Sequence, residues 1–286
     1  MKYLACTADD FGLALPVNEA VEEAHLHGIL TGASLMVTGP AAEDAVDRAR
    51  RLPALGVGLH LVLVDGCPAL PPEDIPDLVG SDGRLNTNPV SMGIRIFFQR
   101  HVQRQVEQEM RAQFTRFLAT GLKLDHVNGH HHFHQHPSIV GMLARMAREY
   151  GIGSARWPVE APLNSWRAQR NRPALRFAAW LFSAARLLGM RQRLERAGIH
   201  CNDHLFGLHE SGNMTLERVE RFLRALPEGA TEIYCHPATR AWPGPDALPQ
   251  DYRCVEEFHA MAAPALLALV EEMGVHLLSF GGLHQP

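Results

Sequence analysis

The sequence predicts an α/β fold: a single barrel-like domain over residues 1–286, with about seven strands. Short apolar runs alternate with stretches of helical periodicity, which is typical of βαβ units and a parallel sheet. No internal repeat and no linker-like stretch divides the chain. Hydrophobic residues make up 46% of the sequence and charged residues 20%, which is typical of a globular protein with a sizeable core.

The first strand–helix unit has the pattern that the later units repeat. Residues 2–8 form an apolar run that stops at Asp9-Asp10, and Pro16 opens a helix that Gly28 ends. By the same criteria we expect strands at residues 31–37, 55–63, 122–127, 155–159, 230–235 and 275–280. We expect the further helices at residues 40–52, 102–120, 137–150, 173–190, 215–226 and 256–273.

Residues 64–90 interrupt this alternation. The segment is rich in Pro, Gly and Asp, and it is too long for a simple connection between two elements. Long irregular loops in compact domains are usually functional or disordered. We therefore expect this segment to cover a substrate.

Histidines are concentrated in one short segment. Six of the 17 histidines lie between His126 and His136. Asn128-Gly129 is expected to end the strand before them, and Pro137 is expected to open the next helix. Imidazole is the commonest protein metal ligand, and α/β folds carry their chemistry where strands end and helices begin. The alternative is a solvated His-rich loop that binds metal only by accident.

Three further polar groups stand at predicted strand ends. Asp9 and Asp10 end the first strand, His60 lies on the third, and His236 ends a late one. Because the carboxyl ends of parallel strands share one face, these groups are expected to meet there. One Asp, one His and one His of the cluster would give three protein ligands with open positions for water, as in a catalytic metal site.

Each of these groups also has a structural alternative. The two aspartates are residue types that cap helix N-termini, His60 is explained equally by a hydrogen-bonded core histidine, and His236 by a turn before Pro237. Their shared position at one end of the sheet favours the site. If both aspartates reach it, one can bind metal while the other takes a proton from water.

Charge and cysteine content exclude several classes of protein. The net charge of −4 argues against nucleic-acid binding. Five scattered cysteines indicate a reducing compartment rather than a disulfide framework. The N-terminus reaches Asp9 too soon for a signal-peptide core, and no apolar run is long enough to span a bilayer. We expect a cytoplasmic protein.

Taken together and in this order, these positions resemble the YdjC-like carbohydrate deacetylases, and the resemblance covers nearly the whole chain. The stretches around Met36–Pro40 and Leu59–Gly66 are most similar to the hopanoid-biosynthesis (HpnK) branch of that family. The motifs that carry the resemblance are Thr7-Ala8-Asp9-Asp10-Phe11-Gly12, Gly58-Leu59-His60-Leu61, Asn128-Gly129-His130-His131-His132-Phe133-His134 and Cys235-His236-Pro237-Ala238.

The resemblance implies a distorted TIM-like (β/α) barrel and one divalent metal ion. By motif, Asp10, His60 and His130 would be its ligands. Zinc or magnesium is expected, with manganese or cobalt as alternatives.

The resemblance also implies roles for the remaining site residues. Asp9 would be the catalytic base, and His236 a general acid or oxyanion partner. His132 and His134 would line the pocket or orient ligands. Asn128 stands where the chitooligosaccharide branch carries an Asp, so it would orient a ligand without a charge.

The implied activity is hydrolytic removal of an N-acetyl group from an amino sugar, specifically a hopanoid-linked N-acetylglucosamine. The first alternative is a chitooligosaccharide deacetylase. The second is a metal-dependent hydrolase of a phosphoester or cyclic amide, since Asp/His clusters on βα barrels also support those reactions. The third is a non-catalytic metal or carbohydrate binder.

The segment from residue 156 to residue 196 is strongly basic. It holds nine arginines and two glutamates, a net charge of +7, interleaved with Trp and Phe. Such a segment is typical of peripheral contact with anionic lipid headgroups at the inner face of the membrane, which a lipid-linked sugar would need. The alternatives are a buried helix with a solvated basic rim, or a homodimer contact.

Overall fold

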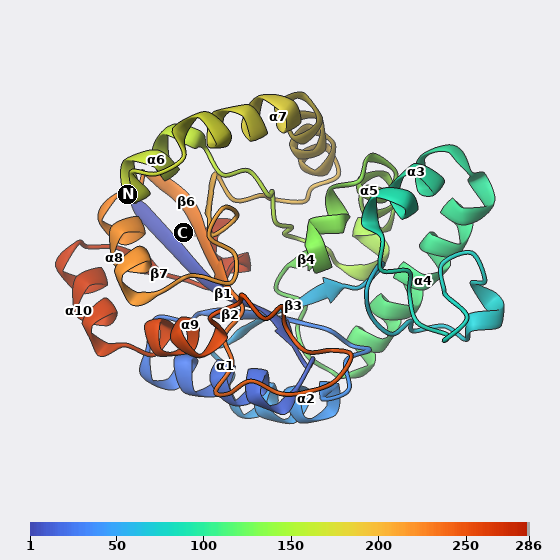
Figure 1. Cartoon of the computed structure of the whole chain (residues 1–286), viewed down its shortest axis with the longest axis horizontal. Coiled ribbons are helices and arrows are strands. Elements are labelled where there is room, and N and C mark those ends of the chain that lie inside the picture. Colours follow the sequence, from blue (N-terminus) through green and yellow to red (C-terminus); the bar gives the residue numbers. More distant parts are fainter. Residues whose placement is uncertain (285–286) are drawn as a thin grey trace.

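The computed structural model describes residues 1–284, apart from the side chain of Ser183, and has seven parallel strands in that part of the chain (Figure 1). Six strands lie in the order β4-β3-β2-β1-β6-β5, and β7 pairs with β1. The strands are β1 (Lys2–Phe11), β2 (Gly32–Leu35), β3 (Gly56–Leu61), β4 (Val127–Gly129), β5 (His204–Phe206), β6 (Gly229–Cys235) and β7 (His276–Leu277). The predicted fold class is confirmed.

Strand β1 is the centre of the sheet. It pairs with β6 from Lys2 to Ala8 on one side. On the other side, its first half pairs with β7 and its second half with β2. Its residues from Leu4 onward are buried. A strand that is buried on both faces has a nearly continuous apolar sequence, which is why this strand could be predicted from the sequence.

An irregular segment continues the sheet beyond β4. Val127 forms a parallel bridge with Ala155, and Ser154 forms one with His200. The backbone N–H of Arg156 donates to the carbonyl of Val127 at 2.9 Å. The segment therefore lies between β4 and the chain that enters β5, and it curls the sheet toward a distorted barrel.

Helices surround the curled sheet (Figure 1). Six of them have Pro in the first turn, where its missing N–H costs nothing. The helices are α1 (Leu15–His27), α2 (Ala42–Arg51), α3 (Pro89–Phe98), α4 (Arg100–Ala119), α5 (Pro137–Tyr150), α6 (Pro162–Gln169), α7 (Pro173–Arg196), α8 (Leu216–Arg224), α9 (Cys254–Met261) and α10 (Pro264–Glu272), with short 3₁₀ turns η1 (Pro72–Asp74), η2 (His130–Gln135) and η3 (Gly281–His284). Among the described residues, no helix combines the length and apolar character that crossing a bilayer requires.

Two predicted strands differ from the structure. Of the strand expected at residues 122–127, only Val127 lies in β4, which continues through Asn128 and Gly129 because these two residues pair with β3. Residues 155–159 form only a bridge, because the N–H of Trp157 donates to the side chain of Asn202 instead of to a strand.

The C-terminal predictions also need correction. The helix expected over residues 256–273 is two helices, α9 and α10, because Pro264 cannot donate the backbone hydrogen bond that continuity requires. The strand expected at residues 275–280 is reduced to β7, because Ser279 and Gly281 donate to the carboxylate of Asp125. The sequence analysis missed α3, α6 and β5.

The irregular segment at residues 64–90 is anchored on α4. The buried carboxylate of Glu109 accepts from the N–H groups of Ala69, at 2.6 Å, and Leu70, at 3.0 Å. The last residues of the segment form the start of α3. The segment is therefore held by a polar side chain of α4, the helix that was predicted from its amphipathic pattern to pack on the core.

Candidate metal and catalytic site

Asp9 and Asp10 lie near the carboxyl end of β1, and both are buried. Successive side chains of a regular strand point to opposite faces. Here the register of β1 with β2 shifts between Ala8 and Phe11, and Asp10 has a left-handed backbone with φ of 64°. This β-bulge brings both carboxylates to one site.

Asp10, His60 and His130 form a compact group of three potential metal ligands. One ligand atom from each lies within 4.8 Å of the other two. The Oδ1 atom of Asp10 is 3.2 Å from Nε2 of His60 and 3.2 Å from Nδ1 of His130. Nε2 of His60 is buried and has no hydrogen-bond partner among the described residues. One carboxylate, two imidazoles and an unsatisfied buried nitrogen fit a divalent cation with open positions.

Asn128 orients His60. Its Oδ1 lies 2.7 Å from Nδ1 of His60, and its Nδ2 donates to Oδ1 of Asp9 at 2.9 Å. Because Nδ2 is committed to a carboxylate, Oδ1 must accept from Nδ1–H of the imidazole. That tautomer leaves the lone pair of His60 Nε2 facing Asp10, as a metal ligand requires.

Asp9 lies in a fully satisfied hydrogen-bond network that shares Asn128 with His60. Nη1 and Nη2 of Arg156 donate to its two oxygens at 2.6 Å and 2.9 Å. Ser34 and Asn128 each donate to Oδ1 at 2.9 Å. On its other side, Arg156 donates to both oxygens of Glu232 on β6. Asp9 is therefore held rigidly beside the ligand group.

Nearby charges determine the protonation of both aspartates. Burial by itself would raise the pKa of each carboxyl group. Arg156 more than offsets this for Asp9, as do His130 and His60 for Asp10, so both pKa values lie well below the usual range. Burial would lower the pKa of His130, but the facing Asp10 carboxylate raises it overall. Both aspartates are therefore ionised at neutral pH.

His132 and His134 differ in position. His132 lines the pocket, and its Nε2 lies 3.1 Å from the hydroxyl of Tyr234. His134 does not line the pocket, and its Nε2 lies 3.0 Å from the backbone carbonyl of Arg156, to which it can donate. Burial lowers the pKa of both, to about 3 for His134. His134 thus supports the backbone of the arginine that holds Asp9.

His236 lies directly after β6 and lines the same pocket. Its Nδ1 is buried without a hydrogen-bond partner in the described part of the chain. Its backbone N–H donates to the buried carboxylate of Glu257 at 2.5 Å. The rings of His236 and Tyr252 lie 5.2 Å apart between centroids. The imidazole is therefore anchored through its backbone and has a free ring nitrogen.

These groups surround a pocket of about 400 Å³ at the carboxyl edge of the sheet. Part of its wall comes from the loops after β5 and β6. The lining residues are Asp9, Asp10, Leu13, His60, Asp65, Gly129, His130, His131, His132, Leu208, Ser211, Tyr234, His236, Pro245, Asp246, Ala247, Leu248, Pro249 and Tyr252. A pocket of this size accommodates one or two sugar rings.

Two loops meet over the pocket. Asp65 is the residue of the segment 64–90 that lines it, whereas residues 245–249 line it from the loop after β6. Arg84 forms an ion pair with Asp246 and so joins the two loops. The loop after β6 supplies more of the wall than the sequence analysis foresaw.

Backbone strain is concentrated at this site. Six described residues other than glycine have positive φ, and four of them line the pocket. These four are Asp10, Asp65, His131 and His132. Left-handed backbone outside glycine is uncommon, and it persists where surrounding structure enforces a functional geometry.

Sequence reasoning missed several contributors to the site. Arg156 and Glu232 lie in the middle of an irregular segment and of a strand, so neither had a motif. Arg156 was instead counted as part of a basic surface segment. Glu232 is itself a charged residue within the apolar run of β6. Because glutamate is almost never fully buried without a partner, its position was the one available signal that a buried cation lies beside it.

The fold and the site define the class of the protein: a barrel-like α/β protein with a carboxylate–imidazole group at the carboxyl edge of its parallel sheet. The model for the YdjC-like protein family matches residues 3–272. The chain therefore belongs to the YdjC-like family.

Named relatives agree with this assignment. A carbohydrate deacetylase from Brevibacillus brevis is 34% identical over 240 residues, covering 82% of this chain and 81% of its own. A carbohydrate deacetylase from Mus musculus is 32% identical, covering 98% of this chain and 94% of its own. A solved Enterococcus faecalis structure, provisionally assigned to cellobiose-phosphate cleavage, shares the fold with a TM-score of 0.73 at 24% identity, covering 99% of this chain and 98% of its own.

Proposed function

We propose that this protein removes an N-acetyl group from an amino sugar by hydrolysis. The observation that carries the proposal is the juxtaposition of Asp10, His60 and His130 with the ionised Asp9 in one pocket. Two curated relatives that cover most of the chain are carbohydrate deacetylases, which supports a sugar substrate.

Asp10, His60 and His130 would hold one divalent cation, with zinc or magnesium ahead of manganese and cobalt. A bound cation would polarise the acetamide carbonyl and lower the pKa of a coordinated water. Asp9 needs a water acidified in this way, because the four donors on its carboxylate lower its affinity for a proton. With such a water, Asp9 would serve as the base of the proposed reaction despite its low proton affinity.

The remaining steps would fall to histidines that line the same pocket. Water adds to the acetamide carbon as Asp9 takes one of its protons. His236, with Nδ1 unsatisfied, then protonates the nitrogen, the C–N bond breaks, and free amine and acetate leave. Base and acid assistance each typically contribute about 10²–10⁴-fold. His132 and the hydroxyl of Tyr234 would contact the sugar beside them.

We further propose that the sugar is a lipid-linked N-acetylglucosamine of the hopanoid type and that the enzyme works at the cytoplasmic face of the membrane. The similarity of Met36–Pro40 to the hopanoid branch and the basic, aromatic segment at residues 156–196 support this substrate. Residues 64–90 would cover it, which the position of Asp65 and the Arg84–Asp246 ion pair support.

Acetate release tests the proposal. The chelated protein is supplied with each metal in turn and assayed on soluble chitobiose and on a glucosaminyl hopanoid bearing the N-acetyl group. Metal-dependent release from only the lipid-linked sugar supports the full proposal. Release from chitobiose would instead indicate a deacetylase that acts in oligosaccharide breakdown. Asp10→Ala should abolish both release and tight metal binding.

Two outcomes would replace deacetylation by another function. Phosphate release from phosphoesters without acetate release would indicate another metal-dependent hydrolase. Sugar binding without turnover, unchanged in Asp9→Asn, would indicate a binding protein.

A further inference from the structure

We propose that the outward faces of α3 and α7 form a docking surface for an anionic lipid bilayer, next to the mouth of the pocket. This lipid-facing surface consists of exposed apolar residues on the two helices, together with exposed arginines on α6, on the α6–α7 connection and on α7. Its members are Val90, Ile94, Phe97, Phe98, Leu175, Phe177, Leu181, Phe182, Leu188, Arg167, Arg170, Arg172 and Arg186.

Helix α3 exposes a complete apolar face. Val90, Ile94, Phe97 and Phe98 are spaced at i, i+4, i+7 and i+8, which places them on one side of the helix. All four are exposed, and Phe98 has 75% of its surface accessible. The opposite face, with Met92 and Ile96, is buried. A surface helix normally turns polar residues outward. The outward face of α3 is instead apolar, as expected of a face that binds another surface.

Helix α7 repeats the same feature. Arg176, Leu187 and Met190 are buried on its inner side. Its outer side exposes Leu175, Leu181, Phe182 and Leu188, and Phe182 has 93% of its surface accessible. Isolated exposed apolar residues are ordinary, but contiguous ones on a helix face mark an interaction surface.

The helices that carry these faces and their neighbours hold more basic than acidic residues. Residues 89–106, 130–148 and 161–194 contain twelve arginines and no Asp or Glu, in a chain with net charge −4. Some of these arginines are neutralised from elsewhere, for example Arg95 by Asp77 and Arg145 by Glu107. In the described chain, Arg167, Arg170, Arg172 and Arg186 are exposed and have no acidic partner. They add positive charge beside the apolar faces.

Neither helix lines the pocket, but both contact segments next to its lining residues. Arg176 of α7 pairs with Glu210, next to Ser211 of the pocket wall. Further along α7, Nη2 of Arg186 donates to Gln135 at 3.2 Å, at the end of η2, which carries His130.

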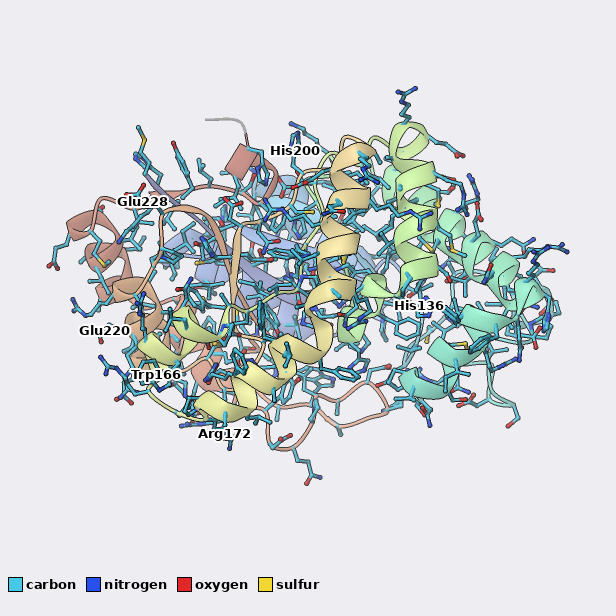
Figure 2. The ribbon with its side chains drawn as sticks, turned by 90° about the horizontal axis from the view of Figure 1, so that it is seen from above. His136, Trp166, Arg172, His200, Glu220 and Glu228 are labelled. Atoms are coloured by element: carbon cyan, nitrogen blue, oxygen red, sulfur yellow. The ribbon has the colours of Figure 1, made fainter. Side chains whose placement is uncertain are left out.

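On the other side of η2, the ring of Phe97 lies 6.3 Å from that of His136. Figure 2 shows α7 starting beside Arg172, with Trp166 on the preceding helix α6, and running toward His200. The lipid-facing surface therefore extends from the Ser211 wall, past the metal-ligand segment, to α3.

An anionic bilayer complements the charge and apolar character of this surface better than a second copy of the chain does. A twofold dimer brings the same patch together on both subunits, and here that would bring unpaired arginines face to face. Anionic headgroups supply the missing negative charge, and the acyl region accepts Phe98 and Phe182. Delivery of a lipid-borne sugar to the pocket rests on the proposed function, whereas vesicle binding does not.

Vesicle flotation tests this surface with the full chain. We expect flotation with phosphatidylglycerol vesicles, weaker flotation with neutral phosphatidylcholine, and loss of binding as salt rises. Phe98→Ser and Phe182→Ser should each weaken binding roughly tenfold. Leu26→Ser is the matched control, because Leu26 is a similarly exposed apolar residue on α1, and it should bind like the unmodified chain.

Two results would overturn the docking surface. One is absence of binding to phosphatidylglycerol vesicles at low salt. The other is a dimer by light scattering that Phe98→Ser or Phe182→Ser dissociates, which would make the surface an interface between copies. Acetate release from chitobiose, if the proposed activity extends to it, should be unchanged in both variants. Loss of binding with retained turnover therefore separates a failure of docking from a failure of the deacetylase proposal.

Discussion

Two buried arginines, each placed between two carboxylates, have different consequences in this protein. Arg156 joins Asp9 to Glu232 at the site, and all four of its hydrogen bonds to them are 2.6–2.9 Å long. Arg176 joins Glu160 to Glu210 beneath α7, but it also donates to Ser165 and Asn171.

The protonation of the acids differs accordingly. Burial would raise the pKa of Asp9, but Arg156 lowers it well below the usual range. Burial raises the pKa of Glu160 to about 7, with Glu210 adding to the rise and Ser165 and Arg176 opposing it. Both carboxylates are buried, so the donors and charges around each one, more than burial itself, decide whether it is ionised.

Removing either arginine should have the largest effect on stability. Arg156→Met and Arg176→Met should each lower the free energy of unfolding by about 3–5 kcal/mol, because each leaves buried carboxylates without their cation. Only Arg156→Met should also abolish acetate release. Urea unfolding and the acetate assay measure the two effects. An active Arg156→Met variant would show that Asp9 needs no fixed partner.

Asp9→Asn isolates the charge of Asp9 from its position. The amide keeps an oxygen that can accept from Arg156, so the fold and tight metal binding should persist. Turnover should fall by about 10²–10⁴-fold, as expected for loss of a general base. Metal titration and acetate release on the same preparation check both statements, and a near-normal rate would exclude Asp9 as the base.

Glu160→Gln should change the pH dependence of stability. Because the pKa of Glu160 is about 7 in the folded chain and near 4.5 when unfolded, its contribution is fully present below about pH 4.5 and is lost as pH rises through 7. The unmodified chain should therefore lose stability relative to Glu160→Gln over that window, on the order of 3 kcal/mol. Urea unfolding at pH 5 and pH 8 measures it, and parallel curves would contradict the raised pKa.

Asn128→Asp should have the smallest effect. It replaces the amide that donates to Asp9 with a second carboxylate 2.9 Å away, although the new oxygen can still accept from His60. Stability at neutral pH should fall by roughly 1–3 kcal/mol, and less at acid pH, where one of the two acids holds a proton. Unfolding experiments at both pH values check this, and unchanged stability at neutral pH would mean that Arg156 neutralises both acids.

Local patterns in the sequence were enough for the fold class and most strands and helices. The apolar run of β1, the stripe of α4 and the prolines that open helices are each determined within one element, by periodicity and backbone chemistry. The same holds for the approximate position of the site. Asp10, His60 and His130 are each found where a strand ends, and parallel strands bring their carboxyl ends to one edge.

Only the tertiary structure decided which polar groups pair across the chain. Arg156 meets Asp9 and Glu232 from sequence separations of 147 and 76 residues, and its segment is held by isolated bridges that no periodicity encodes. The β-bulge that turns Asp9 and Asp10 to one site depends on the register with β2. The exposure of Phe98 and Phe182 likewise depends on how the surrounding helices pack, because no described element covers these two side chains. Sequence periodicity records which face of an element is apolar, whereas the partner of that face is set by the packing of the whole chain.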